Sequence, residues 1–273
     1  MLKYTLIALI AAAALTLLIR VGLSIKASPF PAYPEHTPEL TRIPLPDNLP
    51  ALVRRFYQAI AGDEIPVIDS AVLTLSGHLR FMGITFPARM RFIHEAGRNY
   101  RHYIEAMVFN FPLLKVNEAY LDGRSRLELP VGVVENEPKV DQAANLGLWG
   151  ESLWLSTIFI TDSRVRWETI DDASARLIVP YGDTGEEDSF TVFFNAQTGL
   201  ISRMEAMRWK ETTDTEKTRW ILEPLGWETV HGIRVPSPAA VTWASEGTPW
   251  LVVTQDDIAY NVDVSAYVRG RGL

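Results

Sequence analysis

The chain has 273 residues, 47% of them hydrophobic and 22% charged, which is enough for one large hydrophobic core or two small ones. A net charge of -7 argues against a protein whose main task is to bind phosphate backbones, because such proteins carry clustered Lys and Arg. The sequence has no cysteine, so disulfides, thiolate metal sites and thiol nucleophiles are excluded together.

The N-terminal stretch is a candidate membrane segment. Tyr4 to Ile19 carry no charge, and five more uncharged residues separate Arg20 from Lys26. A helix needs about 20 apolar residues to cross a bilayer, and an arginine near its end can reach the headgroups. We predict a transmembrane anchor or signal over residues 1–26, with an uncleaved anchor as the leading interpretation and a buried core helix as a third. The flanking charges leave its orientation open.

Residues 27–48 are predicted to form a Pro-rich linker. Proline fixes its own backbone angle and lacks an N–H, so it blocks helices and sheet ladders. The prolines concerned are Pro29, Pro31, Pro34, Pro38, Pro44 and Pro46, and Pro50 follows directly after the segment. The segment is either a semi-rigid stalk or an ordinary loop. After Pro50, apolar residues at helical spacing predict a short helix that ends at Gly62.

The next part of the chain, up to about Val131, has the period of two that is typical of strands. Ala71 to Phe81 form the longest alternating run, and shorter runs follow around Met90 and His102. Asp122-Gly123 is a residue pair typical of a tight hairpin. Because connections this short force antiparallel neighbours, we predict a meander of roughly four or five strands.

Residues 141–159 break the strand pattern and predict a helix with Asp141 as its N-cap. Gly147 and Gly150 fall on its apolar stripe, which lowers helix propensity and points to a close approach to a sheet. Strands then resume, and Ser189 to Trp209 read as a hairpin with Gly199 at the left-handed turn position. The other predicted strands span residues 165–170, 173–180, 218–223, 239–245 and 251–261.

These elements predict an α+β fold that is mainly antiparallel β. We expect a strongly curved sheet of roughly ten strands, a half-barrel that cups one or two helices. Residues 49–273 are predicted to form a single globular domain after the membrane segment and the linker.

Few residues suggest a catalytic, metal-binding or cofactor-binding role. His78, His94 and His102 fall in three successive predicted strands and could face one another, but their spacing matches no zinc template. The motifs of serine hydrolases, zinc proteases, phosphate-binding loops and dinucleotide-binding folds are missing. Acidic runs at 171–172, 186–188 and 256–257 are interpreted as turn residues. We therefore predict no cofactor, no metal and no nucleic-acid partner, and we lean against an enzyme.

Glu151 and the tryptophans are the exceptions. Glu151 interrupts a helix of small and aromatic residues, so it is either an acid with a shifted pKa or the partner of an arginine such as Arg166 or Arg203. All the tryptophans lie in the second half: Trp149, Trp154, Trp167, Trp209, Trp220, Trp227, Trp243 and Trp250. Large aromatics on a curved sheet either fill a core or line an apolar cavity. The predicted ligand-binding residues are Glu151, Trp154, Trp167, Trp209 and Trp243.

Several short motifs resemble a bacterial family of unknown function whose members are membrane-anchored. They are Leu49 to Tyr57, Glu151, Leu153 to Leu155, Arg166-Trp167, Phe194 to Gly199, Arg208-Trp209, Gly232 to Pro236 and Trp243. Ser156 stands where the resemblance leads us to expect proline, a departure near the end of the predicted helix. The layout of helix and meander is also similar to that of LolA-like lipoprotein carriers, which implies a curved sheet around an apolar cavity.

The leading functional hypothesis is a membrane-tethered, non-enzymatic binder of a lipid or other hydrophobic ligand in the cell envelope, with its globular part on the extracytoplasmic side. One alternative is a hydrolase that works with carboxylates such as Glu151. Another is a scaffold that binds a partner protein at a strand edge.

Overall fold

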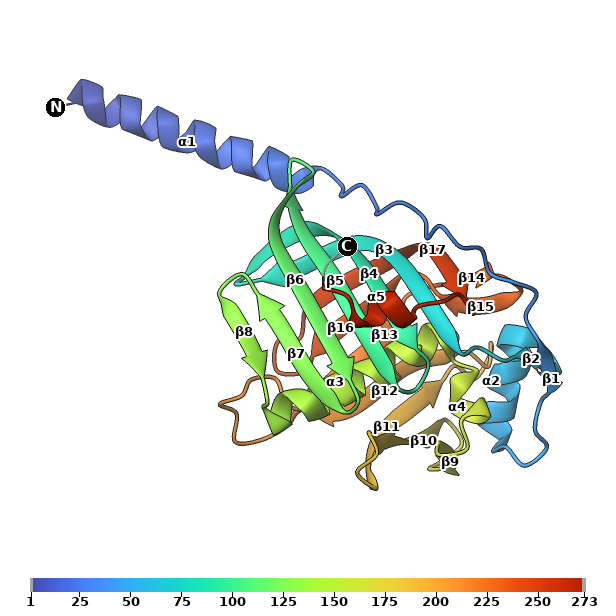
Figure 1. Ribbon diagram of the computed structural model, residues 1–273. Coiled ribbons are helices and arrows are strands. Elements are labelled where there is room, and N and C mark those ends of the chain that lie inside the picture. Colours follow the sequence, from blue (N-terminus) through green and yellow to red (C-terminus); the bar gives the residue numbers. More distant parts are fainter. Residues whose placement is uncertain (1, 272–273) are drawn as a thin grey trace.

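The structure is a computed structural model that describes residues 2–271. A single strongly curved antiparallel sheet organises the fold (Figure 1). Within the described residues it has 13 strands in the order β8-β7-β6-β5-β4-β3-β17-β16-β13-β12-β11-β10-β9. The sheet does not close on itself, since β8 and β9 form its free edges. The predicted fold class, a half-barrel of antiparallel strands around a few helices, is confirmed.

The first half of the sheet is a meander of hairpins. Its strands are β3 (Ser70–Phe81), β4 (Ile84–Glu95), β5 (Asn99–Val108), β6 (Phe111–Leu121), β7 (Arg124–Leu129) and β8 (Gly132–Glu135). The strands of the second half are β9 (Arg166–Thr169), β10 (Ser174–Tyr181), β11 (Glu186–Phe194), β12 (Ile201–Arg208), β13 (Thr218–Pro224), β16 (Ala239–Trp243) and β17 (Pro249–Tyr260). The two halves meet where β17 pairs with β3, so that Leu251 lies opposite Leu79 and Tyr260 opposite Ala71.

Helices and short sheets complete the domain. The helices are α1 (Leu2–Ser24), α2 (Ala51–Ala61), α3 (Pro138–Glu151), the 3-10 helix η1 (Ser152–Leu155), α4 (Ile158–Thr161) and α5 (Ser265–Arg269). The short sheets pair β1 (Arg42–Pro44) with β2 (Glu64–Pro66), and β14 (Trp227–Val230) with β15 (Ile233–Pro236). These short strands were not predicted, because three or four residues are too few to show a period.

The turns follow the sequence signals. Asp122 and Gly123 have φ angles of 51° and 79°, the left-handed values that a two-residue hairpin needs. Gly199 has a φ of 74° in the turn between β11 and β12, as its position in the predicted hairpin required.

The predicted helix over residues 141–159 is wrong in its bounds. It begins at Pro138, whose missing N–H costs nothing at the first helical position. Asp141 is not the N-cap: its carboxylate accepts the N–H and the hydroxyl of Ser125, each at 2.7 Å, and pairs with Arg124 at 2.9 Å. After Glu151 the helix tightens into η1. Directly after η1, the carbonyl of Ser156 accepts a hydrogen bond of 2.7 Å from the Tyr57 hydroxyl.

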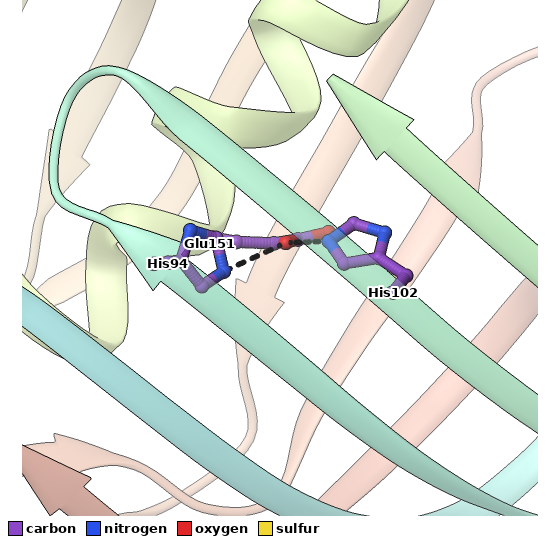
Figure 2. A group of neighbouring side chains, drawn as sticks. All are labelled: His94, His102 and Glu151. Carbon is purple, nitrogen blue, oxygen red and sulfur yellow. Dashed lines mark hydrogen bonds and ion pairs between the residues drawn. The ribbon is translucent and has the colours of Figure 1, made fainter. Parts of the chain in front are cut away.

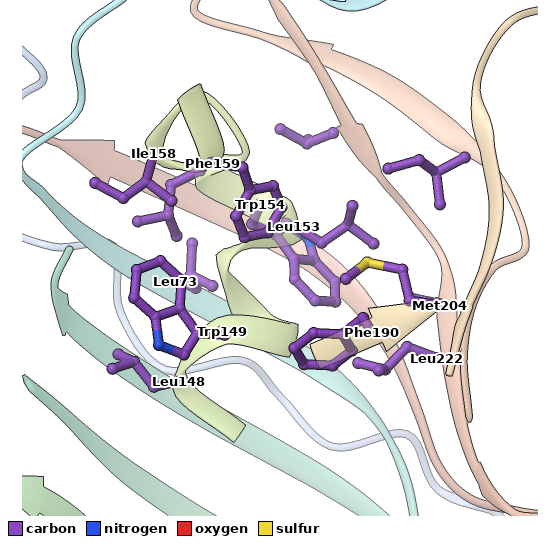
Figure 3. Packing of buried hydrophobic residues seen from close by; sticks show 14 of the residues in the cluster. Leu73, Leu148, Trp149, Leu153, Trp154, Ile158, Phe159, Phe190, Met204 and Leu222 are labelled. Carbon is purple, nitrogen blue, oxygen red and sulfur yellow. The ribbon is translucent and has the colours of Figure 1, made fainter. Parts of the chain in front are cut away.

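The helical segment fills the hollow of the half-barrel (Figure 3). Trp149, Leu153 and Trp154 from α3 and η1 are buried against the inner face of the sheet. Leu73 of β3 and Phe190 of β11 lie in the same cluster although they come from different halves of the chain. The core is therefore shared by both halves of the sheet, and most of the space beneath it is occupied by side chains.

The two glycines of α3 differ in what surrounds them. A Cβ added at Gly150 would lie 2.9 Å from a ring carbon of Trp220, whereas at Gly147 the nearest atom is the Tyr100 hydroxyl at 3.5 Å. We expect Gly147→Ala to stabilise the protein by up to about 1 kcal/mol, through helix propensity. Gly150→Ala should destabilise it by about 1 to 3 kcal/mol, because the enclosed indole must move. Urea unfolding of both variants checks this, and equal effects would contradict it.

The N-terminal segment leads away from the domain. Within the described chain, Lys3–Ser24 is long and apolar enough to cross a membrane, a test that signal sequences near an N-terminus also pass. After α1 the chain runs along the surface of the half-barrel (Figure 1). Tyr33 is buried there and donates its hydroxyl to the carbonyl of Asp263 at 2.9 Å. Residues 27–48 are thus held against the domain at Tyr33 and at β1.

Candidate functional site

His94, His102 and Glu151 converge beneath the sheet (Figure 2). Strands β4 and β5 supply the histidines, and Glu151 is the last residue of α3. In the register of β4 and β5, His102 lies opposite Phe92 and His94 lies opposite Tyr100. The histidines are therefore diagonal neighbours on one face, with ring centroids 6.1 Å apart.

A chain of polar contacts connects these groups. Glu151 Oε2 lies 2.5 Å from His102 Nε2 and 3.2 Å from His94 Nε2. On its other side, His102 Nδ1 lies 3.6 Å from Glu118 Oε2. Tyr100 donates its hydroxyl to Glu118 Oε1 at 2.6 Å. His102 is thus placed between two carboxylates.

The pKa values follow from this arrangement. Burial opposes a charge on His102, yet the carboxylates of Glu151 and Glu118 outweigh it and raise the pKa of the imidazole to about 9. Burial also opposes ionisation of Glu151, but His102 and His94 lower the pKa of this carboxyl to about 2. The pKa of His94 is lowered, because burial outweighs the attraction of Glu151. At neutral pH His102 is an imidazolium and His94 is neutral.

Arg208 completes the charge balance. Its Nε donates to the carbonyl of Ala143 at 2.9 Å, and its guanidinium lies 4.5 Å from the ring centroid of Trp220. Burial lowers the pKa of Arg208 against the attraction of Glu118, yet an arginine stays charged. The charges of Arg208 and His102 thus offset those of Glu118 and Glu151. We call these four side chains together with His94 the ion cluster.

The ion cluster also contains the described residues best placed to hold a cation. One donor atom each from His94, His102 and Glu151 lies within 4.8 Å of the others. Around a tetrahedral zinc, with bonds of about 2.0 to 2.1 Å, two ligand atoms stay about 3.3 Å apart. The 2.5 Å separation between His102 and Glu151 is shorter, and fits a direct hydrogen bond between two charged groups better.

Two adjoining pockets lie next to the ion cluster. The inner cavity, of about 60 Å³, is lined mainly by apolar side chains, and Tyr100, His102, Glu118, Glu151 and Arg208 also face it. The outer pocket, of about 240 Å³, lies between β6 to β8, the start of α3 and the end of β12. Glu118 and Arg208 line both.

Three tryptophans of the inner cavity have a polar group without a partner. The indole N–H groups of Trp154, Trp220 and Trp250 are buried and have no hydrogen-bond partner among residues 2–271. Leaving a buried donor unpaired costs about 1 to 3 kcal/mol, so such groups are uncommon in native proteins. All three tryptophans line the inner cavity.

The predicted site residues divide among three places. Glu151 and Trp154 line the inner cavity, and Trp209 and Trp243 line the outer pocket. Trp167 lies elsewhere: it donates its indole N–H to the carbonyl of Phe159 at 3.2 Å and its ring lies against Phe194. The structure therefore brings four of these five side chains to adjoining pockets.

The predicted arginine partners of Glu151 are wrong. Arg166 pairs with Glu187, and Arg203 lies 3.0 Å from Glu205. Both arginines lie on strands of the second half of the sheet. The end of α3 faces β4 and β5 instead, so that Glu151 contacts the histidines of these strands.

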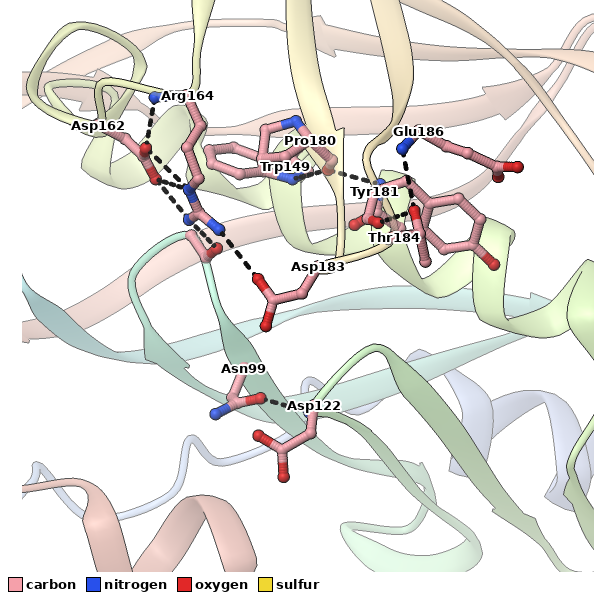
Figure 4. A network of polar contacts seen from close by, with 12 residues as sticks. Asn99, Asp122, Trp149, Asp162, Arg164, Pro180, Tyr181, Asp183, Thr184 and Glu186 are labelled. Carbon is pink, nitrogen blue, oxygen red and sulfur yellow. Dashed lines mark hydrogen bonds and ion pairs between the residues drawn. The ribbon is translucent and has the colours of Figure 1, made fainter.

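A larger pocket, of about 560 Å³, has a polar lining that shares no residue with the ion cluster, and it lies between the turns after β4, β6 and β10. Figure 4 shows polar side chains at these turns. Several of the pocket's charged side chains form ion pairs. Arg164 pairs with Asp162 at 2.6 Å and lies 3.9 Å from Asp183, and Arg269 pairs with Glu95 at 2.7 Å. The N–H of Asp122 donates to the Asn99 side chain at 2.8 Å, so the contacts join loops from distant parts of the chain.

Fold and site together define an open antiparallel half-barrel that encloses one helical segment and a largely buried cluster of offsetting charges. The chain belongs to the family of unknown function DUF6544, which matches residues 39–253. The family resemblance seen in the sequence is thereby confirmed. No curated protein gives a significant match.

Two solved structures are similar in fold. One is a DUF1329 family protein from Desulfovibrio piger, with 13% identity, a TM-score of 0.44 and coverage of 78% of this chain and 92% of that one. The other is a LolA superfamily protein from Nitrosomonas europaea, with 10% identity, a TM-score of 0.43 and coverage of 77% and 91%.

Proposed function

We propose that this protein is a membrane-tethered, non-enzymatic binder of a lipid or other amphiphilic ligand in the cell envelope. The observation that carries the proposal is the inner cavity with its three unpartnered indole N–H groups. An apolar cavity with a few convergent polar groups is the usual form of a small-molecule site. A ligand with an apolar part and an acceptor oxygen, such as an ester or a carboxyl, satisfies both features.

The size of the pockets limits how such a ligand is held. The inner cavity of about 60 Å³ has room for only a few water-sized groups. The outer pocket of about 240 Å³ is itself smaller than the roughly 300 to 1,000 Å³ usual for drug-sized ligands. The ligand therefore enters with one end only, and Arg208 and Glu118 meet it where the pockets adjoin.

The ion cluster does not favour the alternative of a carboxylate-dependent hydrolase. A general acid or base works best with a pKa near the working pH. The pKa of Glu151 is about 2 and that of His102 about 9, so both keep their charge at neutral pH. Their role in the proposed function is to hold α3 against β4 and β5 and to shape the polar wall of the cavity.

In the proposed function, helix α1 is the segment that tethers the protein to the membrane. The described part of this helix is almost entirely exposed, and its apolar side chains face solvent unless a membrane surrounds them. We assign residues 1–26 to the anchor, 27–48 to the linker and 49–273 to a domain on the extracytoplasmic side.

The test is native mass spectrometry of the full chain released from detergent micelles. We expect a bound amphiphile that survives detergent removal. The double variant Trp220→Phe and Trp250→Phe removes two of the unpartnered donors, at about 1 kcal/mol each, and should weaken binding by about tenfold or more. Trp227→Phe is the matched control, because Trp227 packs on Phe56 outside both pockets. A wild-type chain free of ligand, or equal occupancy in all three proteins, would refute the proposal.

A further inference from the structure

Large apolar side chains are exposed at one end of the meander. The hairpins β3–β4, β5–β6 and β7–β8 turn at the same end, because each strand is antiparallel to the next. At these turns Met82 is 86% exposed, Phe111 75% and Val131 88%. We call the following exposed residues the tip surface: Phe81, Met82, Ile84, Phe111, Leu113, Val131 and Val133.

The tip surface has no acidic residue in its own segments. Residues 80–87, 109–116 and 129–134 contain no Asp or Glu, but they include Arg80 and Lys115, of which Lys115 pairs with Glu105 at 3.2 Å. A soluble surface normally mixes both signs of charge with scattered apolar residues. Clustered apolar residues with a few cations are instead typical of protein surfaces that lie at a lipid headgroup layer.

The end of α1 is fixed to this surface (Figure 1). The N–H of Phe109 donates to the carbonyl of Gly22 at 3.0 Å, and Asn110 and Ser28 exchange two hydrogen bonds of 2.8 Å. A Cβ on Gly22 would lie 2.6 Å from the ring of Phe109, so glycine is needed for this approach. The hairpin end and the helix end are therefore at the same level.

We infer that the tip surface inserts into the headgroup region of the lipid bilayer that α1 spans. This inference rests on the membrane tether of the proposed function. The 23 residues of α1 make a helix of about 34 Å, which matches a hydrocarbon core of about 30 Å. A bilayer around α1 thus has its surface where the helix ends, and the tips are the part of the domain that meets it. The half-barrel is held with one fixed side toward the membrane.

The experiment uses the absence of cysteine in the chain. Single variants Met82→Cys and Phe111→Cys of the full-length protein are labelled with an environment-sensitive fluorophore and reconstituted into phosphatidylcholine and phosphatidylglycerol vesicles. Arg98→Cys is the control, because Arg98 is exposed in the turn at the opposite end of β4. At about 3.3 Å per residue, that turn is roughly 36 Å away from the tips.

We expect blue-shifted emission at positions 82 and 111, with quenching by doxyl-labelled lipid several-fold stronger than at position 98. If the protein floats with the vesicles but all three positions behave alike, the tip surface does not enter the bilayer and the tether stands. If the protein does not float with the vesicles, the tether of the proposed function is refuted and this inference with it. Circular dichroism of the labelled proteins confirms that each variant is folded.

Discussion

Glu151→Gln is expected to lower the free energy of unfolding by about 3 kcal/mol at neutral pH, since it removes one member of a largely buried ion pair. The substitution leaves the shape of the side chain almost unchanged. It leaves His102 with Glu118 alone, at 3.6 Å, and it removes one of the two negative charges that balance His102 and Arg208. Urea unfolding of the full-length protein in detergent measures the loss.

The matched control is Glu228→Gln, because Glu228 is exposed on β14 and makes no ion pair within residues 2–271. Its effect should stay within about 0.5 kcal/mol. A double-mutant cycle with His102→Gln then isolates the coupling between the two side chains. A coupling near zero would show that the short contact between Glu151 and His102 contributes nothing to stability.

The same ion pair is expected to make stability depend on pH in two separate ranges. The pKa of His102 is about 9 in the folded protein against 6.5 in the unfolded chain, so the folded state binds more protons between these values. Its contribution is complete below pH 6.5 and is lost as the pH rises through 9, a loss of about 3 kcal/mol.

In acid, protonation of Glu151 also lowers the stability. Its pKa is about 2 in the folded protein against 4.5 unfolded, so its contribution is complete above pH 4.5 and is lost as the pH falls through 2. The alkaline loss and the acid loss both come from the interaction between His102 and Glu151, so their energies are not added. The lowered pKa of His94 removes further stability as the pH falls below 6.5, so the free energy of unfolding, measured from pH 3 to 9.5, should be greatest at roughly pH 6 to 7. In His102→Gln, most of the decline in the free energy of unfolding at alkaline pH should disappear. An unchanged decline would show that groups other than His102 cause it.

Local patterns predicted most of the fold. The alternation in Ala71 to Phe81 and the left-handed turn residues Gly123 and Gly199 are short-range signals, and each one led to the correct hairpin. The bounds of α3 were harder to predict, because the role of Asp141 depends on Ser125, which reaches it only in the folded sheet. A carboxylate at a helix start looks like a cap whether it bonds its own helix or a neighbouring strand.

The site was predicted only in part. Glu151 attracted attention because a charge interrupted an apolar helix, but its partners depend on the register of β4 and β5. His94 and His102 were noted on successive strands, yet a sequence does not show that both face a helix end. Glu118 gave no signal, and Arg208 was noted only within the Arg208-Trp209 motif of the family resemblance. Such pairings are long-range and appear only with the tertiary fold.

The place of β17 in the sheet has a consequence for biosynthesis. Among the described residues this is the last strand, but it pairs with β3, roughly 180 positions earlier, in the middle of the half-barrel. During synthesis, the hairpins of the first half leave one edge of β3 unpaired until β17 has been synthesised. A chain that stops before residue 249 lacks the strand that joins the halves, and it is expected to aggregate instead of forming a shorter stable domain.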